Sequence, residues 1–121
     1  MSEQINKIIS ELEGYESELY KASVDYKNLA RDAAEKRATY DVAYAVEFLK
    51  NTTNKDLKLT VPATEALTVQ TVQNQLIACR IAEALAEGAK RHLNALQSNL
   101  TSVQTRASLL KTERSLTNMY A

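Results

Sequence analysis

Apolar residues recur at alternating steps of three and four over the first fifty residues of the chain. Two series, each stepping by seven, carry this pattern. They are Ile5, Leu12, Leu19, Tyr26, Ala33 and Tyr40, and Ile8, Tyr15, Ala22, Leu29, Lys36 and Ala43. Such spacing places one apolar seam along a helix, as a coiled coil requires. Residues 3–50 contain no proline and a single glycine, so the pattern predicts one helix over about 3–50.

A short polar segment interrupts the pattern after residue 50. Residues 51–56 read NTTNKD, and Asn, Thr and Asp side chains favour turns because they compete for backbone hydrogen bonds. Pro62 is tolerated only in the first turn of a helix, so we expect the second helix to begin between Thr60 and Thr64. The sequence therefore predicts a turn over 51–61 and a second helix over about 62–118.

The second predicted helix carries a seam of the same kind. Its two series are Val72, Cys79, Ala86, Leu93, Leu100 and Ala107, and Ala82, Ala89, Leu96, Val103 and Leu110. The middle of this helix is rich in small residues, which permit close approach of another helix. Gly88 costs about 1 kcal/mol relative to alanine within a helix. We therefore expect a packing reason for this glycine.

Two long helices and one short connection predict an all-α fold: an antiparallel helical hairpin that forms a single domain over residues 1–121. A hairpin buries only one stripe of each helix. Residues 66–79 carry no charge, and 92–105 carry none apart from His92. Such faces suit a surface that a partner covers, although they could also be exposed polar faces. We expect a homo-oligomer whose copies meet along the second helix. The predicted interface residues are Val72, Leu76, Cys79, Ala82, Ala86, Ala89, Leu93, Leu96, Leu100 and Val103.

Composition narrows the possible functions. Two glycines and one proline in 121 residues argue against folds with many turns. Cys79 and His92 are the single cysteine and the single histidine, so neither a zinc motif nor a catalytic triad has enough members. Glycine-rich phosphate loops are also absent from the sequence. We therefore expect a protein that is not an enzyme and needs no metal or cofactor.

Charge and hydropathy set further expectations. Fifteen Lys and Arg balance fifteen Asp and Glu. The sequence shows neither a long apolar run nor a signal-peptide core, which predicts a soluble cytoplasmic protein without a membrane partner. Residues 1–20 hold five acids and one base, whereas 88–121 hold five bases and one acid. Attraction between these ends would orient an antiparallel hairpin or join subunits end to end.

The stretch from Arg31 to Tyr44 is the most informative for function. On a helix, Arg37, Tyr40 and Tyr44 share a face, and Lys36 lies one turn before Tyr40. Cations beside tyrosine rings suit single-stranded nucleic acid, which offers phosphates for charge and bases for stacking. The predicted contact residues are Lys36, Arg37, Tyr40, Tyr44, Lys50, Lys55 and Lys58. A structural explanation stays open, since Arg37 and Asp41 form an i,i+4 pair and Tyr40 fits the seam.

The order of these features resembles the UvsY-like family of phage recombination mediators. The matching parts are KRATYD at 36–41 with Tyr44, the turn at 51–60, and the helix from Val72 to Ser108. The resemblance implies a homo-oligomer that binds single-stranded DNA in an infected bacterial host. It implies, as partners, a RecA-like recombinase and single-strand binding protein, and it places DNA contacts on Lys36 and Arg37. The chain departs from the family in lacking tryptophan and in its acidic first twenty residues.

Two functions therefore follow from the sequence. The first is a DNA recombination mediator that binds single-stranded DNA and loads a recombinase without catalysing a reaction. The second is a structural or regulatory coiled-coil protein, such as a virion component, a scaffold or an inhibitor of a host protein, which does not bind nucleic acid.

Overall fold

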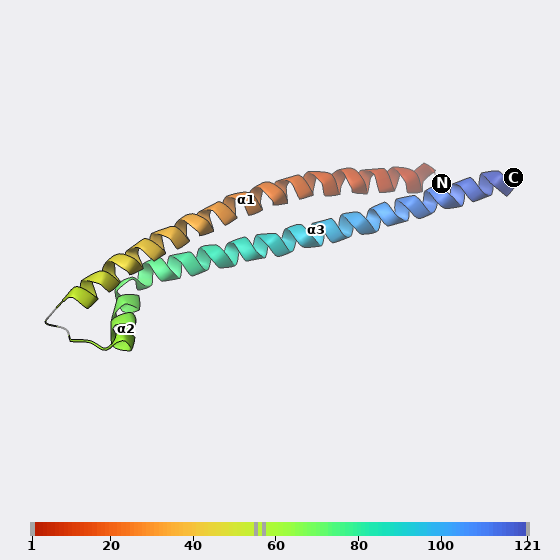
Figure 1. Ribbon diagram of the computed structural model, residues 1–121. Coiled ribbons are helices and arrows are strands. Elements are labelled where there is room, and N and C mark those ends of the chain that lie inside the picture. Colours follow the sequence, from red (N-terminus) through yellow and green to blue (C-terminus); the bar gives the residue numbers. More distant parts are fainter. Residues whose placement is uncertain (1, 55, 57, 121) are drawn as a thin grey trace. The chain divides into compact units, whose positions relative to one another are not determined.

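Every element in the described part of the chain, residues 2–54, 56 and 58–120, is an α-helix (Figure 1). In this computed structural model, α1 spans Ser2–Thr53, α2 spans Val61–Thr71 and α3 spans Gln73–Tyr120. The prediction of an all-α fold is confirmed. Helix α1 continues three residues beyond its predicted end, and the hydroxyls of Thr52 and Thr53 donate to the carbonyl of Leu49 over 3.1 and 2.7 Å.

Helix α2 begins where the proline predicted a helix start. Thr60 is its N-cap, and the Thr60 hydroxyl accepts a hydrogen bond from the backbone N–H of Ala63 over 3.4 Å. Pro62 lies in the first turn, where its missing N–H leaves no helical bond unmade. The prediction that this helix begins between Thr60 and Thr64 is confirmed.

The predicted single helix over 62–118 is corrected by a break at Val72. Val72 has φ −101° and ψ 20°, and Figure 1 shows α2 turned away from the start of α3. The hydroxyls of Thr64, Thr68 and Thr71 each donate to the carbonyl four residues earlier, over 2.7–3.0 Å. Such back-bonding bends helices, and β-branched residues are weak helix formers. Val72 itself fits the apolar seam, so the seam alone did not reveal the break.

The chain divides into two compact units. Unit 1 comprises residues 1–26 with 89–121, and unit 2 comprises residues 27–88. Helix α1 and helix α3 each contribute to both units without interruption. The sequence prediction of one domain made no such division, because neither helix carries a proline or a change in its apolar pattern at the boundary.

Unit 1 packs the beginning of α1 against the end of α3. Ala22, Leu96 and Val103 are its buried apolar side chains. At the surface, Nη2 of Arg106 lies 2.8 Å from Oε2 of Glu11, and both side chains are partly exposed. This pair joins an acid of the first twenty residues to a base of the last thirty-four. The predicted attraction between the two ends thus acts within the chain at this pair.

Unit 2 holds α2, the end of α1 and the beginning of α3. Its core is made of small and β-branched side chains, namely Ala33, Thr64, Thr68, Val72, Cys79 and Ala82. The Asn51 side-chain amide donates to the hydroxyl of Thr68 over 3.0 Å, and that hydroxyl donates to the carbonyl of Thr64 over 2.7 Å. The bond from Asn51 connects α1 to α2 and leaves both polar groups satisfied.

Burial follows the two predicted seams closely. Every member of the first-helix series except Lys36 is buried or half-buried, and so is every member of the second-helix series. Gly88 differs from expectation, because no heavy atom of the chain other than its own helical surroundings lies within 4 Å of the position that a Cβ would take. The expected packing reason for Gly88 is therefore not found within the chain.

Gly14 offers a test of helix propensity in unit 1. A Cβ at Gly14 would also meet nothing within 4 Å. Gly14→Ala is therefore expected to raise the free energy of unfolding by about 1 kcal/mol, because alanine loses less backbone entropy in a helix. Urea denaturation followed by circular dichroism measures this gain. The exposed Ser17→Ala change on the same helix is expected to give a smaller gain, and equal effects would contradict the explanation.

Candidate nucleic-acid interface

The four predicted contact residues between positions 36 and 44 lie on α1 within unit 2. Residues 27–53 contain neither glycine nor proline, so this part of α1 is continuous. Lys36 and Arg37 have side chains that are 45% and 52% exposed. Tyr40 and Tyr44 are half-buried. The structure therefore brings the two cations and the two rings together on one helix, with the cations more accessible than the rings.

Arg37 forms a network that joins α1 to α3. Its Nη1 lies 3.7 Å from Oε1 of Glu83 and donates to Sγ of Cys79 over 3.9 Å, while its Nε lies 3.8 Å from Oδ1 of Asp41. The Cys79 thiol donates in turn to Oε1 of Glu83 over 3.3 Å. The guanidinium carbon also lies 5.8 Å from the centre of the Tyr40 ring, a cation–π distance.

This network favours the charged form of Arg37. The hydrogen bond with Cys79 raises the pKa of the guanidinium, and the negative charges of Glu83 and Asp41 raise it further. The guanidinium is a cation with or without these contacts. Sequence reasoning missed Cys79 and Glu83 as its partners, because they lie more than forty residues away and no local pattern pairs them.

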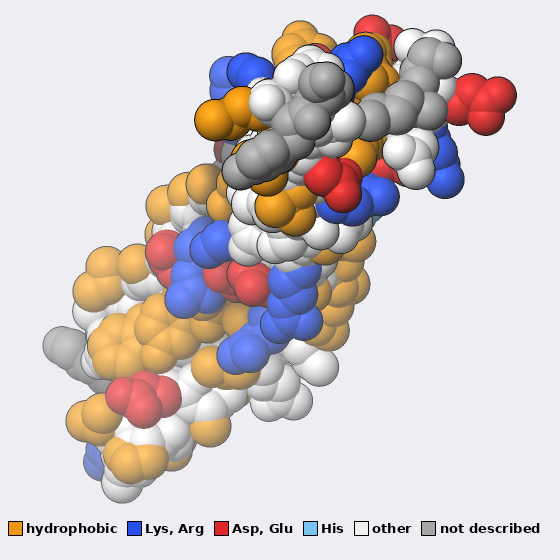
Figure 2. Space-filling view, turned by 90° about the vertical axis from the view of Figure 1, so that its right-hand side faces the viewer, with side chains coloured by type: hydrophobic (Ala, Val, Ile, Leu, Met, Phe, Trp, Pro, Cys, Tyr) orange, Lys and Arg blue, Asp and Glu red, His pale blue; other side chains and the backbone are white. Residues whose placement is uncertain are grey.

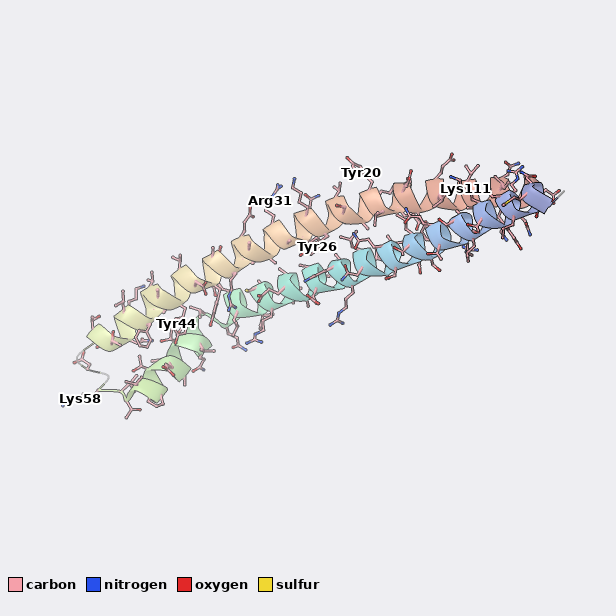
Figure 3. The ribbon with its side chains drawn as sticks, turned by 45° about the vertical axis from the view of Figure 1, so that its right-hand side comes forward. Tyr20, Tyr26, Arg31, Tyr44, Lys58 and Lys111 are labelled. Carbon is pink, nitrogen blue, oxygen red and sulfur yellow. The ribbon has the colours of Figure 1, made fainter. Side chains whose placement is uncertain are left out.

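A row of three aromatic rings continues from Arg37 along α1. The ring centroids of Tyr40 and Tyr44 are 6.0 Å apart at an interplanar angle of 49°. Those of Tyr44 and Phe48 are also 6.0 Å apart, at 16°. Figure 3 shows Tyr44 on the side of α1 that faces α2. Phe48 was not among the predicted residues, although its spacing of four from Tyr44 could have indicated it.

Lys36 and Lys50 are held by acids of the same helix. Nζ of Lys36 lies 3.1 Å from Oδ1 of Asp32, and Nζ of Lys50 lies 3.4 Å from Oε1 of Glu47. Exposed pairs at this spacing contribute about 0.3–0.5 kcal/mol each. Both lysines remain exposed, so a phosphate could compete for either at small cost.

Lys58, which is labelled in Figure 3, lies in the connection between α1 and α2. Its φ of 35° falls in the left-handed region, which non-glycine residues seldom adopt. The connection and the adjoining helix ends line a cavity of about 280 Å³, whose walls are Phe48, Asn51, Thr52, Asn54, Lys58, Leu59, Val61 and Thr64. Lys55, another predicted contact, lies outside the described residues.

The residues predicted to form the oligomer interface pack within the chain itself. In unit 2, Val72, Cys79 and Ala82 are buried, and Leu76 and Ala86 are half-buried. The corresponding residues of unit 1 are also wholly or partly buried, namely Ala89, Leu93, Leu96, Leu100 and Val103. A seam whose apolar side chains serve the contact between the chain's own helices offers little surface to another copy. Within the single chain these residues therefore serve an intrachain contact, and an interface between copies on them stays a prediction.

Within residues 2–54, 56 and 58–120, no group of three or more His, Cys, Asp or Glu side chains is placed to hold a metal ion. No helix in this part of the chain has the length and apolar character needed to cross a membrane. Comparison with known proteins gave no match to a protein-family model, to a curated protein or to a solved structure.

Proposed function

We propose that this protein is a non-enzymatic recombination mediator that binds single-stranded DNA as a homo-oligomer. In this role each chain is an antiparallel helical hairpin that supplies a small cationic and aromatic site on unit 2. The observation that carries the proposal is the placement of the Arg37 guanidinium over the Tyr40 ring, with Lys36 on the preceding position of the same helix. Cations for phosphates and rings for bases are the two requirements of single-strand binding.

The ion pairs within unit 2 are compatible with this role. The acids that hold Lys36 and Lys50 lie three or four residues away on an exposed helix surface. Such pairs are weak and are screened by salt, so phosphates can replace the carboxylates. Arg37 contacts two carboxylates and keeps half of its side chain exposed, which leaves donors for a phosphate.

A single site of this size binds weakly, so repetition in an oligomer is part of the proposal. One strand that contacts several copies gains affinity from the high effective concentration of the neighbouring sites. Because the contacts are mainly to phosphates, DNA of any sequence would be bound. A RecA-like recombinase could then be delivered to strands covered by single-strand binding protein.

Removal of two cations tests the DNA contact. The double variant Lys36→Ala/Arg37→Ala is expected to lower the salt slope of binding by about 1.4, since each phosphate contact to a single strand contributes about 0.7. This corresponds to an affinity about 25-fold weaker at about 0.1 M salt. Fluorescence anisotropy with a labelled oligo-dT strand, titrated at several salt concentrations, measures both quantities.

The matched control is Lys7→Ala/Lys21→Ala, which removes the same charge from α1 in unit 1. Equal loss in both double variants would show that only net charge matters, and would contradict a site on unit 2. Absence of saturable binding by the unaltered protein would overturn the DNA-binding function. For the recombinase step, the time that a RecA-like recombinase needs to start ATP hydrolysis on coated strands is compared for the same two variants.

A structural or regulatory coiled-coil protein is the second candidate, and the charge balance of unit 2 favours it. Residues 27–88 contain eight Lys and Arg and eight Asp and Glu, so this unit attracts polyanions only through local clusters. The half-buried state of Tyr40 and Tyr44 also limits the ring surface open to bases. Self-association without saturable DNA binding in the anisotropy experiment would identify this function.

A further inference from the structure

Unit 2 carries an exposed apolar strip on each of its two longer helix segments. The α1 strip consists of Ala38, Val42, Ala45, Val46 and Leu49, and the α3 strip consists of Ile77, Ile81, Ala84, Leu85 and Gly88. The large side chains of the two strips are between 46% and 64% exposed. Neither strip contains a charged residue. Figure 2 shows hydrophobic side chains, in orange, at many places on the surface in that view.

The strips lie apart from the contact that holds unit 2 together. On α1, the face packed inside the unit contains Ala33 and the Tyr40 ring, and the helical spacing places Val42 and Val46 on a different face. On α3, the packed face contains Cys79 and Ala82, and the helical spacing places the exposed Ile77 and Ile81 on a different face. The strips are therefore apolar surfaces beyond those that intrachain packing uses.

Gly88 leaves room for a helix to approach the α3 strip closely. No heavy atom of the chain other than its own helical surroundings lies within 4 Å of the position that a Cβ would take. Gly88 lies on the same face as Ile81, at a spacing of seven residues. A backbone from outside the chain would use the space that the absent side chain leaves.

The exposed area of the chain is large enough for two such contacts. The chain exposes 9053 Å², whereas a compact monomer of this mass exposes about 6,500 Å². A standard interface covers about 800 Å² on each partner. Two interfaces per chain, one at each strip, would cover about 1,600 Å², which is less than the difference of about 2,500 Å².

We propose that the α3 strip of one copy packs against the α1 strip of a second copy. The two strips match in length, since each spans eleven residue steps, 38 to 49 and 77 to 88, or about 16 Å of helix. A contact between unlike strips covers both apolar surfaces with one kind of interface and builds a ring or an open chain. The proposal names the interface of the oligomer in the proposed function and rests on that self-association.

Charge placed in each strip separately tests the pairing. Val46→Glu places a charge in the α1 strip, and Ile81→Glu places a charge in the α3 strip. Both positions are exposed, so each variant is expected to keep the circular dichroism spectrum of a helical protein. Light scattering is expected to give the 13.5 kDa monomer for each variant alone. An equimolar mixture is expected to give a species of twice that mass, because each variant keeps the strip that the other has lost.

The outcomes separate this pairing from its alternatives. Dissociation by Ile81→Glu alone, with no effect of Val46→Glu, would show a contact between two α3 strips and overturn the proposal. Loss of assembly in the control Leu109→Glu, an exposed leucine of unit 1, would also overturn it, as would an unaltered protein that is monomeric. If the variants dissociate and reassociate as expected but the unaltered protein binds no single-stranded DNA, the interface stands and only the DNA-binding function fails.

Discussion

Replacing Leu96 by alanine is expected to lower the free energy of unfolding of unit 1 by about 3 kcal/mol. Leu96 is only 6% exposed, and it lies in the contact between the beginning of α1 and the end of α3. The change removes buried methyl groups and leaves a cavity that a two-helix contact can close only in part. Urea denaturation followed by circular dichroism measures the loss.

The matched control is Leu109→Ala, on the same helix and in the same unit. Leu109 is 64% exposed, so its truncation is expected to change the free energy of unfolding by less than about 0.5 kcal/mol. Both variants are compared at one protein concentration, because association would add concentration-dependent stability. Similar losses in the two variants would contradict the burial of Leu96 and the exposure of Leu109 on α3.

The thiol of Cys79 is expected to react far more slowly than an exposed thiol. Cys79 has no exposed surface, and its sulfur lies between the side chains of Arg37 and Glu83. Reaction with a thiol reagent therefore requires unit 2 to open. An opening free energy of about 4 kcal/mol would slow the reaction about a thousandfold relative to the unfolded chain. The rate of colour development with an aromatic disulfide reagent reports this directly.

An exposed thiol in the same chain supplies the control. The variant Cys79→Ala/Ser98→Cys carries its thiol at an exposed position of α3 and is expected to react at nearly the rate of the unfolded chain. Arg37→Ala is expected to speed the reaction of Cys79, because it removes a side chain that contacts the sulfur. A native Cys79 that reacts as fast as the control would contradict its burial.

Hydrophobic spacing predicted the larger part of the fold. The heptad series identified which residues of α1 and α3 are buried, because one stripe per helix is enough to specify that contact. Pro62 predicted the start of α2, where the structure adds Thr60 as the N-cap. Spacing did not predict the end of α2 at Thr71, since Val72 at the break fits the apolar seam and leaves the pattern intact.

The candidate site was predicted in part. Helical spacing correctly placed Arg37, Tyr40 and Tyr44 together, because all three lie within two turns of one helix. The contacts of Arg37 with Cys79 and Glu83 depend on how α1 and α3 are aligned, and a single sequence does not contain that alignment. The seam was predicted as the surface between copies, and within the chain it packs α1 against α3, because spacing shows that a face is covered but not which helix covers it.

The threonine hydroxyls have a consequence for hydration. On α3, Thr101, Thr105, Thr112 and Thr117 each donate their hydroxyl proton to the carbonyl four residues earlier. Each of these side chains therefore presents to water a methyl group and an oxygen that no longer has a proton to give. Stripping solvent from such a helix breaks fewer strong bonds to water than its polar composition suggests. The free-energy cost of desolvating a surface that is polar by residue type is then small when another helix covers it.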